Sequence, residues 1–168
     1  MRDIGLPKRK STRLKGYDYS TEGAYFITIC VQDRRNILSE IIVGEGLAPP
    51  EVQLTETGRL AEEQLRQLSV RYPTATVDRY VIMPNHIHFI LRLRDRAGGA
   101  SPSPTVVQVV GAFKSMTTRL CPGKSKLFQR SFYDHVIRGE EDYQEIWSYI
   151  DQNPAKWQED RFYMTETD

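Results

Sequence analysis

The stretch from Tyr80 to Leu91 constrains the chain most, because it places chemically versatile side chains inside a short apolar run. A run rich in Ile, Val and Phe is typical of a β-strand, in which side chains two positions apart share a face. His86 and His88 are therefore expected to be neighbours, with Ile87 facing the other way. Neutral imidazole is a common metal ligand, so the pair predicts an incomplete metal site that needs a further ligand from elsewhere. The alternative is two polar residues on an exposed sheet face, and the spacing alone does not decide between them.

The other periodic segments predict an alternation of strands and helices. Runs rich in β-branched and aromatic residues predict strands over 25–31, 76–83, 86–93 and 132–138, and residues 37–43 are expected to continue the first strand as a hairpin. Amphipathic spacing predicts helices over 55–70, 106–120 and 140–150. Pro84 and Asn85 predict a tight turn between antiparallel neighbours. This order indicates an α+β fold with an antiparallel sheet packed with helices, close to the ferredoxin-like arrangement.

The length of 168 residues fits one domain. We expect a basic flexible tail over residues 1–20, a single folded domain over 21–160 and an acidic tail over 161–168. The composition, with 39% hydrophobic and 27% charged residues, is that of a soluble protein, and neither a membrane helix nor a secretory signal is apparent. A cytoplasmic location is therefore expected. Cys30 and Cys121 lie far apart without a Cys-x-x-Cys motif, which argues against a cysteine metal site.

Basic side chains are unevenly distributed along the chain. Residues 111–130 contain five of them and no acid, namely Lys114, Arg119, Lys124, Lys126 and Arg130. Such a surface favours nucleic-acid binding, although a solvated charged face is the common alternative. A nucleotide-binding loop is excluded, because Gly123-Lys124-Ser125 would need a glycine where Thr118 stands.

Tyr149 and Asn153 are four residues apart on the last predicted helix, so they share one face. Asn153 could then supply an oxygen ligand to an ion held by His86 and His88, with Tyr149 beside it. The alternative is that Tyr149 packs and Asn153 caps the helix before Pro154.

Four ordered motifs resemble those of a known family. They are Met83-Pro84-Asn85-His86-Ile87-His88 and residues 112–115, 128–138 and 149–154, and the likeness spans about residues 20 to 158. Together they resemble the single-tyrosine HUH transposases, particularly the REP-associated tyrosine transposase branch. The resemblance implies a ferredoxin-like catalytic domain and a transposase that nicks and rejoins single-stranded DNA near hairpins through a covalent 5′-phosphotyrosine.

The resemblance also implies roles for individual residues. Tyr149 would be the nucleophile, and His86, His88 and Asn153 would hold Mg²⁺ or Mn²⁺, where ligand chemistry alone would favour zinc. Tyr133, Tyr143 and His135 are the competing candidates, with packing the expected role of His135. The partners would be single-stranded or hairpin DNA and a second copy of the chain, near the nucleoid. Residues 25–31 or the last helix could form the homodimer surface.

Two other functions remain open at this point. One is a domesticated protein that binds hairpin DNA without transposing it. The other is a structural nucleic-acid-binding domain, which would keep the basic face and have no need of Tyr149.

Overall fold

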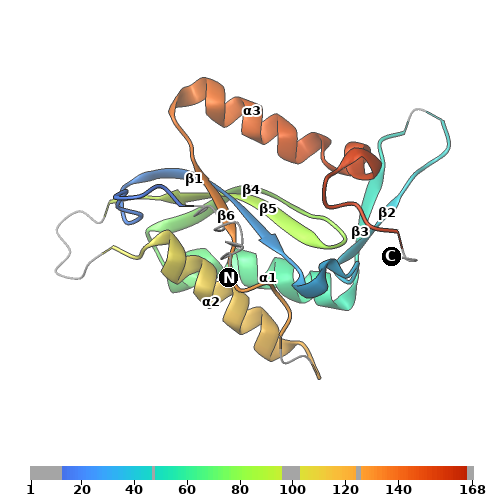
Figure 1. Cartoon of the computed structure of the whole chain (residues 1–168), viewed down its shortest axis with the longest axis horizontal. Coiled ribbons are helices and arrows are strands. Elements are labelled where there is room, and N and C mark those ends of the chain that lie inside the picture. Colours follow the sequence, from blue (N-terminus) through green and yellow to red (C-terminus); the bar gives the residue numbers. More distant parts are fainter. Residues whose placement is uncertain (1–12, 47, 96–102, 124–125, 166–168) are drawn as a thin grey trace, which may run out of the picture.

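The computed structural model describes residues 13–46, 48–95, 103–123 and 126–165, and a four-stranded antiparallel sheet forms its centre (Figure 1). The strands in spatial order are β4 (Ala75–Ile82), β5 (His86–Leu93), β1 (Gly23–Cys30) and β6 (Tyr133–Val136). The helices are α1 (Glu56–Arg71), α2 (Val106–Leu120) and α3 (Gly139–Gln152), and the 3-10 helices are η1 (Gln32–Arg34) and η2 (Pro154–Glu159). The α+β, ferredoxin-like fold predicted from the sequence is confirmed.

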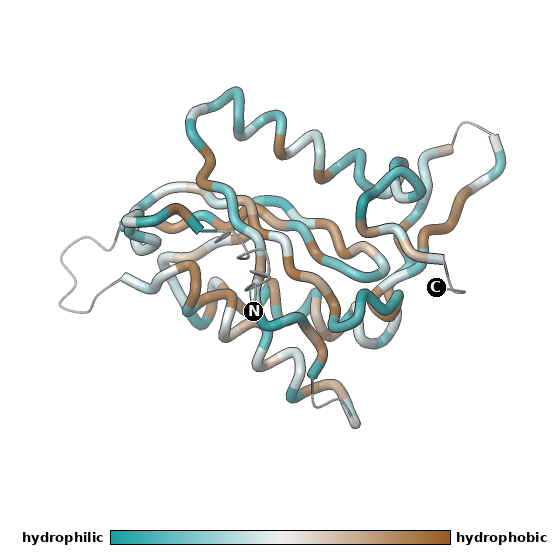
Figure 2. Tube along the Cα trace, in the orientation of Figure 1, coloured by the Kyte–Doolittle hydropathy of each residue, from teal (hydrophilic) through white to brown (hydrophobic). Residues whose placement is uncertain are grey.

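The two faces of the sheet have different partners. Alternate residues of the two central strands face α1 and α2 and are fully buried, among them Tyr25, Ile27, Ile29, Ile87, Phe89 and Leu91. Each large apolar side chain buried in this way contributes roughly 1.5–3 kcal/mol. The intervening residues, including both histidines of β5, face α3. Figure 2 shows the hydrophobic residues concentrated in the central strands, while α3 is largely hydrophilic.

Side-chain caps define where α1 and α2 begin. The Thr55 hydroxyl accepts a hydrogen bond from the Gly58 amide, and Thr105 forms a reciprocal capping box with Gln108. Position 58 also requires glycine, because a Cβ there would overlap the carbonyl oxygen of Leu38. No helix in the described ranges is both long enough and apolar enough to cross a membrane.

Helix α3 covers the face of the sheet that carries the histidines, and both apolar and charged contacts hold it there. Ile146 and Ile150 pack against Ala24 and Ile90. On β4, Arg79 forms an ion pair with Asp151 at 2.6 Å, and Asp78 accepts hydrogen bonds from Arg92 of β5 and from the Tyr143 hydroxyl, each at 2.8 Å. Helix α3 is therefore fixed over β4 and β5.

A second, two-stranded sheet corrects one prediction. Residues 37–43 were expected to form a hairpin with the first strand, but β2 (Ser39–Ile42) pairs with β3 (Glu51–Leu54), which the sequence analysis did not predict. Both edges of β1 are already occupied by β5 and β6, so no position for β2 was left there. The same central location removes β1 from the surfaces available to a partner.

The two ends of the described chain both contact the folded domain. Tyr17 and Tyr19 pack against Tyr25 from the segment before β1. Phe162, in the segment after η2, is buried beside the histidine face of the sheet. Both segments thus contribute side chains to the domain.

Candidate active site

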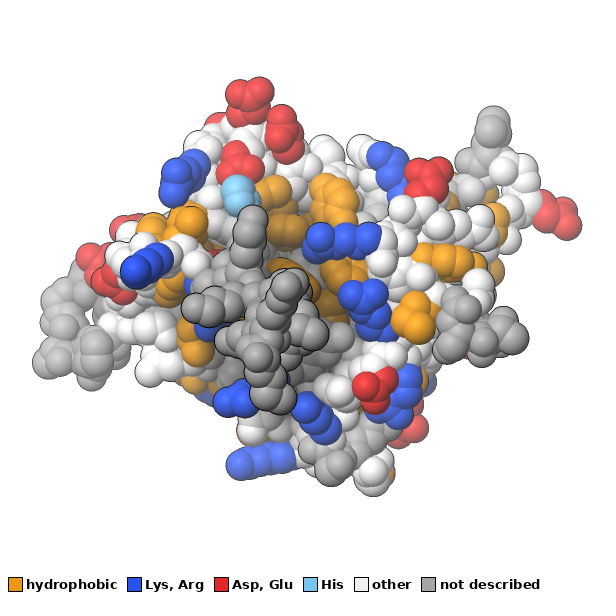
Figure 3. Space-filling model, viewed as in Figure 1, with side chains coloured by type: hydrophobic (Ala, Val, Ile, Leu, Met, Phe, Trp, Pro, Cys, Tyr) orange, Lys and Arg blue, Asp and Glu red, His pale blue; other side chains and the backbone are white. Residues whose placement is uncertain are grey.

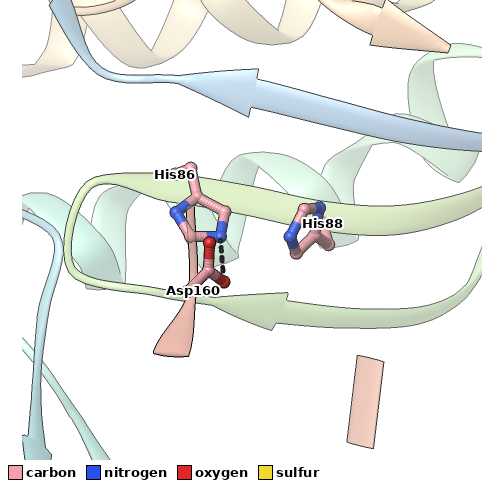
Figure 4. A group of neighbouring side chains, drawn as sticks. All are labelled: His86, His88 and Asp160. Carbon is pink, nitrogen blue, oxygen red and sulfur yellow. Dashed lines mark ion pairs between the residues drawn. The ribbon is translucent and has the colours of Figure 1, made fainter. Parts of the chain in front are cut away.

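The two histidines lie side by side on β5, as the alternation of the strand requires. His86 pairs with Cys30 and His88 with Thr28 in the ladder between β1 and β5. Their ring centroids are 4.5 Å apart, and 0% and 1% of their surfaces are exposed. Figure 4 shows both imidazoles on the same side of the strand, with Asp160 next to His86.

Hydrogen bonds determine which nitrogen of each ring is available. The Asn85 amide nitrogen donates to the carbonyl oxygens of Phe162 at 2.6 Å and Arg34 at 3.3 Å, so Oδ1 of Asn85 is the atom that faces His86. That oxygen can only accept, and Nδ1 of His86 therefore carries the proton at 2.8 Å. Nε2 of His86 keeps its lone pair, which is the state that binds a metal.

A hydrogen bond from the neighbouring strand β1 orients the His88 ring, as Asn85 orients the ring of His86. Nδ1 of His88 lies 2.7 Å from the Thr28 hydroxyl. Both Nε2 atoms and Oδ1 of Asn153 are buried and have no hydrogen-bond partner among the described residues. Three such atoms without partners are costly inside a protein, and a shared metal ion would satisfy all three.

Burial keeps the two imidazoles neutral. It lowers the pKa of His86 to about 3, with Asn153 opposing this effect, and lowers the pKa of His88 well below its usual value. Both rings are therefore in the ligand form at neutral pH.

The structure adds a candidate ligand that the sequence analysis missed. Oδ2 of Asp160 lies 3.7 Å from Nε2 of His86, and the ligand atoms of His86, His88 and Asp160 all lie within 4.8 Å of one another. An anionic oxygen would strengthen binding of Mg²⁺ or Mn²⁺, which prefer oxygen ligands. Nothing in the local sequence marks Asp160, because it reaches the histidines only through the fold of the segment after η2.

Tyr149 faces the histidine pair from α3. Its ring centroid is 5.4 Å from that of His88, and 45% of the residue surface is exposed. Burial raises the pKa of its hydroxyl, and Asp160 adds to this effect, while Asn153 and Arg161 oppose it. The phenol is thus protonated at neutral pH and needs help to act as a nucleophile.

The competing candidates have other contacts. The Tyr143 hydroxyl donates to Asp78 at 2.8 Å, and His135 lies 2.8 Å from Asp142 at the start of α3. Tyr133 is exposed on β6, with the Arg161 guanidinium over its ring. Tyr149 is the tyrosine whose ring contacts His88.

Residues 160–164, here named the closing segment, cover the histidines. The Phe162 ring centroid is 4.5 Å from that of His86 and 6.2 Å from that of His88. The Met164 carbonyl oxygen also accepts a hydrogen bond from the Asn36 side chain at 3.0 Å. The Nε2 atoms of both imidazoles are consequently shielded from solvent in this conformation.

The basic residues predicted for DNA binding have different surroundings. Nζ of Lys114 donates to the carbonyl oxygens of Gln129 and Arg130, which ties α2 to the following loop, and Arg119 is exposed. Lys126 and Arg130 line a hollow of about 550 Å³ together with Arg34 and Tyr133. Lys124 lies outside the described residues. Figure 3 shows Lys and Arg side chains spread over the face below α3, with a group of acidic side chains at its upper edge and others toward its left and right ends.

Comparisons with known proteins agree with this fold. No family model matches the sequence. An uncharacterized protein of Haemophilus influenzae is 32% identical over 96% of this chain and 97% of its own length. Another protein of that organism, named as a REP-associated tyrosine transposase, is 26% identical over 83% of this chain and 74% of its own length.

A solved structure is similar as well, that of a REP-associated tyrosine transposase bound to a REP hairpin. It has a TM-score of 0.62 and 23% identity, and the match covers 86% of this chain and 74% of that chain. The ferredoxin-like sheet and the paired histidines are features that the sequence resemblance to the single-tyrosine HUH transposases implies. The chain is thus similar in sequence and in fold to REP-associated tyrosine transposases.

Proposed function

We propose that the protein is a metal-dependent DNA strand transferase that nicks and rejoins single-stranded DNA near hairpins. One observation carries the proposal: among the described residues, Nε2 of His86, Nε2 of His88 and Oδ1 of Asn153 are buried without hydrogen-bond partners, and the Tyr149 ring contacts His88. Unpaired polar atoms in a packed interior indicate a missing ligand. A tyrosine can act as the nucleophile in phosphoryl transfer, and a metal ion beside it can activate the phosphate.

In the proposed reaction, Tyr149 attacks a phosphodiester in line with the leaving oxygen. A bond forms between Oη and phosphorus, and the bond between phosphorus and the 3′-oxygen breaks. The phenolic proton is released and the 3′-oxygen gains one, which leaves a 5′-phosphotyrosine and a free 3′-hydroxyl. The reverse attack rejoins the strand, so no nucleotide cofactor is required.

His86, His88 and Asn153 would hold Mg²⁺ or Mn²⁺, with Asp160 as a further ligand. The bound ion would supply Lewis-acid activation of a non-bridging phosphate oxygen. Asn85 and Thr28 keep the imidazoles turned toward it by their hydrogen bonds to the Nδ1 atoms.

The structural neighbour bound to a REP hairpin supports hairpin DNA as the substrate. The exposed side chains of Arg119, Lys126 and Arg130 would contact its phosphates. We further infer that the protein acts at the nucleoid in the cytoplasm, and that it works as a homodimer.

A second candidate is a domesticated protein that binds hairpin DNA without cleaving it. The observation that favours it is the closing segment, because histidines that are 0% and 1% exposed cannot meet a phosphate until Phe162 moves. In the proposed enzyme the Phe162 ring turns aside when DNA binds while Asp160 and Arg161 keep their places, whereas in the binder the ring stays over the histidines.

Incubation with labelled single-stranded hairpin DNA and Mn²⁺ distinguishes the strand transferase from the protein that only binds. The enzyme should give a protein–DNA adduct that survives denaturation and disappears when EDTA replaces Mn²⁺. Retarded mobility on a native gel without any adduct would support the binder.

A further inference from the structure

Arg161 lines the pocket beside the proposed nucleophile. The pocket has a volume of about 290 Å³, and its walls come from the end of α3, from η2 and from the closing segment: Tyr149, Gln152, Asn153, Lys156, Glu159, Asp160 and Arg161. A phosphate attacked by Tyr149 would have to enter this space. Arg161 and Lys156 are the positively charged members of its wall.

The guanidinium of Arg161 is not committed to an acidic partner. Its carbon lies over the rings of Phe162 at 4.7 Å and Tyr133 at 5.6 Å. Across the described ranges, no carboxylate lies within 4.0 Å of it, whereas Arg79 and Arg92 near α3 are paired with Asp151 and Asp78. The residue is exposed, so the hydrogen-bond donors of Arg161 can serve a ligand.

The stacking on Phe162 places this charge close to the histidine pair, because the same ring covers His86 at 4.5 Å between centroids. Electrostatic effects agree with this location. Arg161 lowers the pKa of both histidines and opposes the rise in the pKa of Tyr149. One cation thus acts on the nucleophile and on both imidazole ligands.

We propose that Arg161 binds a non-bridging oxygen of the scissile phosphate and stabilises the charge that grows on it as Tyr149 attacks. Arginine suits this task because its planar guanidinium matches two phosphate oxygens and stays charged at any working pH. Arg161 transfers no proton in the step. Together with an ion held by His86 and His88, Arg161 would give the phosphate two separate positive centres.

This inference rests on the proposed function. It is tested by measuring how tightly the protein binds DNA whose scissile phosphate carries no charge. Tyr149→Phe protein, which cannot cleave, is titrated without metal against hairpin DNA that carries either a phosphodiester or an uncharged methylphosphonate at the scissile position. If Arg161 contacts this phosphate, neutralising it should weaken binding roughly 10-fold. In Tyr149→Phe/Arg161→Gln protein the same substitution in the DNA should change the affinity less than about 2-fold.

Arg34→Ala in the Tyr149→Phe background is the matched control. The Arg34 guanidinium also lies over the Phe162 ring, at 5.7 Å, but Arg34 does not line the Tyr149 pocket. The methylphosphonate should therefore weaken DNA binding by the Tyr149→Phe/Arg34→Ala protein as much as it weakens DNA binding by the Tyr149→Phe protein. If Arg161→Gln and the methylphosphonate have independent effects on affinity, Arg161 does not contact the scissile phosphate and the inference is wrong.

Cleavage gives a second measurement. With Mn²⁺ present and Tyr149 intact, Arg161→Gln should slow adduct formation by about 100-fold, and Arg161→Lys should lie between it and the unaltered protein. Equal rates for all three would overturn the inference, while absence of an adduct from the unaltered protein would overturn the proposed function instead. Thermal unfolding of each variant identifies any loss of folded protein.

Discussion

The Thr28 hydroxyl oxygen lies 2.7 Å from Nδ1 of His88, across the ladder that pairs β1 with β5. This contact turns Nε2 of His88 toward the candidate metal site. We expect Thr28→Val, which keeps the shape and removes the hydroxyl, to weaken Mn²⁺ binding about 10-fold in calorimetric titrations. Thr76→Val on β4 removes a strand hydroxyl near Asp78 instead, and unchanged affinity is expected for it. Equal losses in both variants would contradict the assigned role of Thr28.

Two substitutions in α3 identify the nucleophile. Tyr149→Phe should abolish the denaturation-resistant adduct and leave hairpin binding nearly intact, since it removes only the attacking oxygen. Tyr143→Phe should retain the adduct, because its hydroxyl is bonded to Asp78 on β4. Gel electrophoresis after denaturation checks both variants. Adduct formation by Tyr149→Phe would mean that Tyr133 or Tyr143 attacks.

The histidine pair predicts how stability depends on pH. In the metal-free protein the folded pKa of His86 is about 3, below the unfolded value of about 6.5. The unfolded chain therefore binds more protons, and the stability present above pH 6.5 is lost as the pH falls towards 3. The loss at pH 5.5 is about 1 kcal/mol for His86, and the lowered pKa of His88 adds a loss in the same direction. Urea unfolding at pH 7.5 and 5.5 measures it, and His86→Gln should reduce the difference.

The basic face predicts a salt dependence. Reversing the charge of Arg119, Lys126 or Arg130 should weaken DNA binding and reduce the slope of log affinity against log salt by roughly 0.7–0.9 for each lost phosphate contact. Lys114 differs, because its bonds to two carbonyl oxygens also link α2 to the loop before β6, so its reversal should lower stability too. Arg66→Glu on α1, where Arg66 pairs with Glu62, is the control. Unaltered slopes in the three variants would place the DNA elsewhere.

Assembly gives a further prediction. Val43, just beyond the end of β2, and Tyr163 are exposed, and both line a groove of about 530 Å³ together with Ile41, Pro50 and Pro154. We expect this apolar surface to support a homodimer. Sedimentation equilibrium at several protein concentrations measures it, and Val43→Lys should shift the mass toward the monomer. A monomer mass at every concentration would contradict the expectation.

The sequence was a good guide wherever the information is local. Alternation along 86–93 predicted the shared face of the histidines, and apolar spacing along 106–120 predicted α2. Tyr149 and Asn153 could be placed on one helical face for the same reason. These features depend on neighbours a few residues apart, for which strand and helix periodicity is a direct rule.

Features that depend on distant contacts could not be predicted. Strand β3 has four residues and pairs with β2, so its pattern was too short to stand out. Asp160, Arg161 and Phe162 reach the histidines because the Asn85 side chain holds the Phe162 carbonyl from 77 positions earlier in the chain. No local rule connects the two, and an acidic tail was therefore the natural expectation for the last residues.

The turn at Pro84 and Asn85 determines more than the direction of the chain. It sets the count of residues between β4 and β5, and side chains alternate strictly along β5. One inserted residue that shifted the ladder would turn both imidazoles into the apolar layer against α1 and α2 and would leave Ile87 and Phe89 facing the tyrosine. The histidine site thus depends on whether the ladder shifts by an odd or an even number of residues: an insertion in this turn that shifts β5 by one residue would remove both imidazoles from the site, however conservative the added residue.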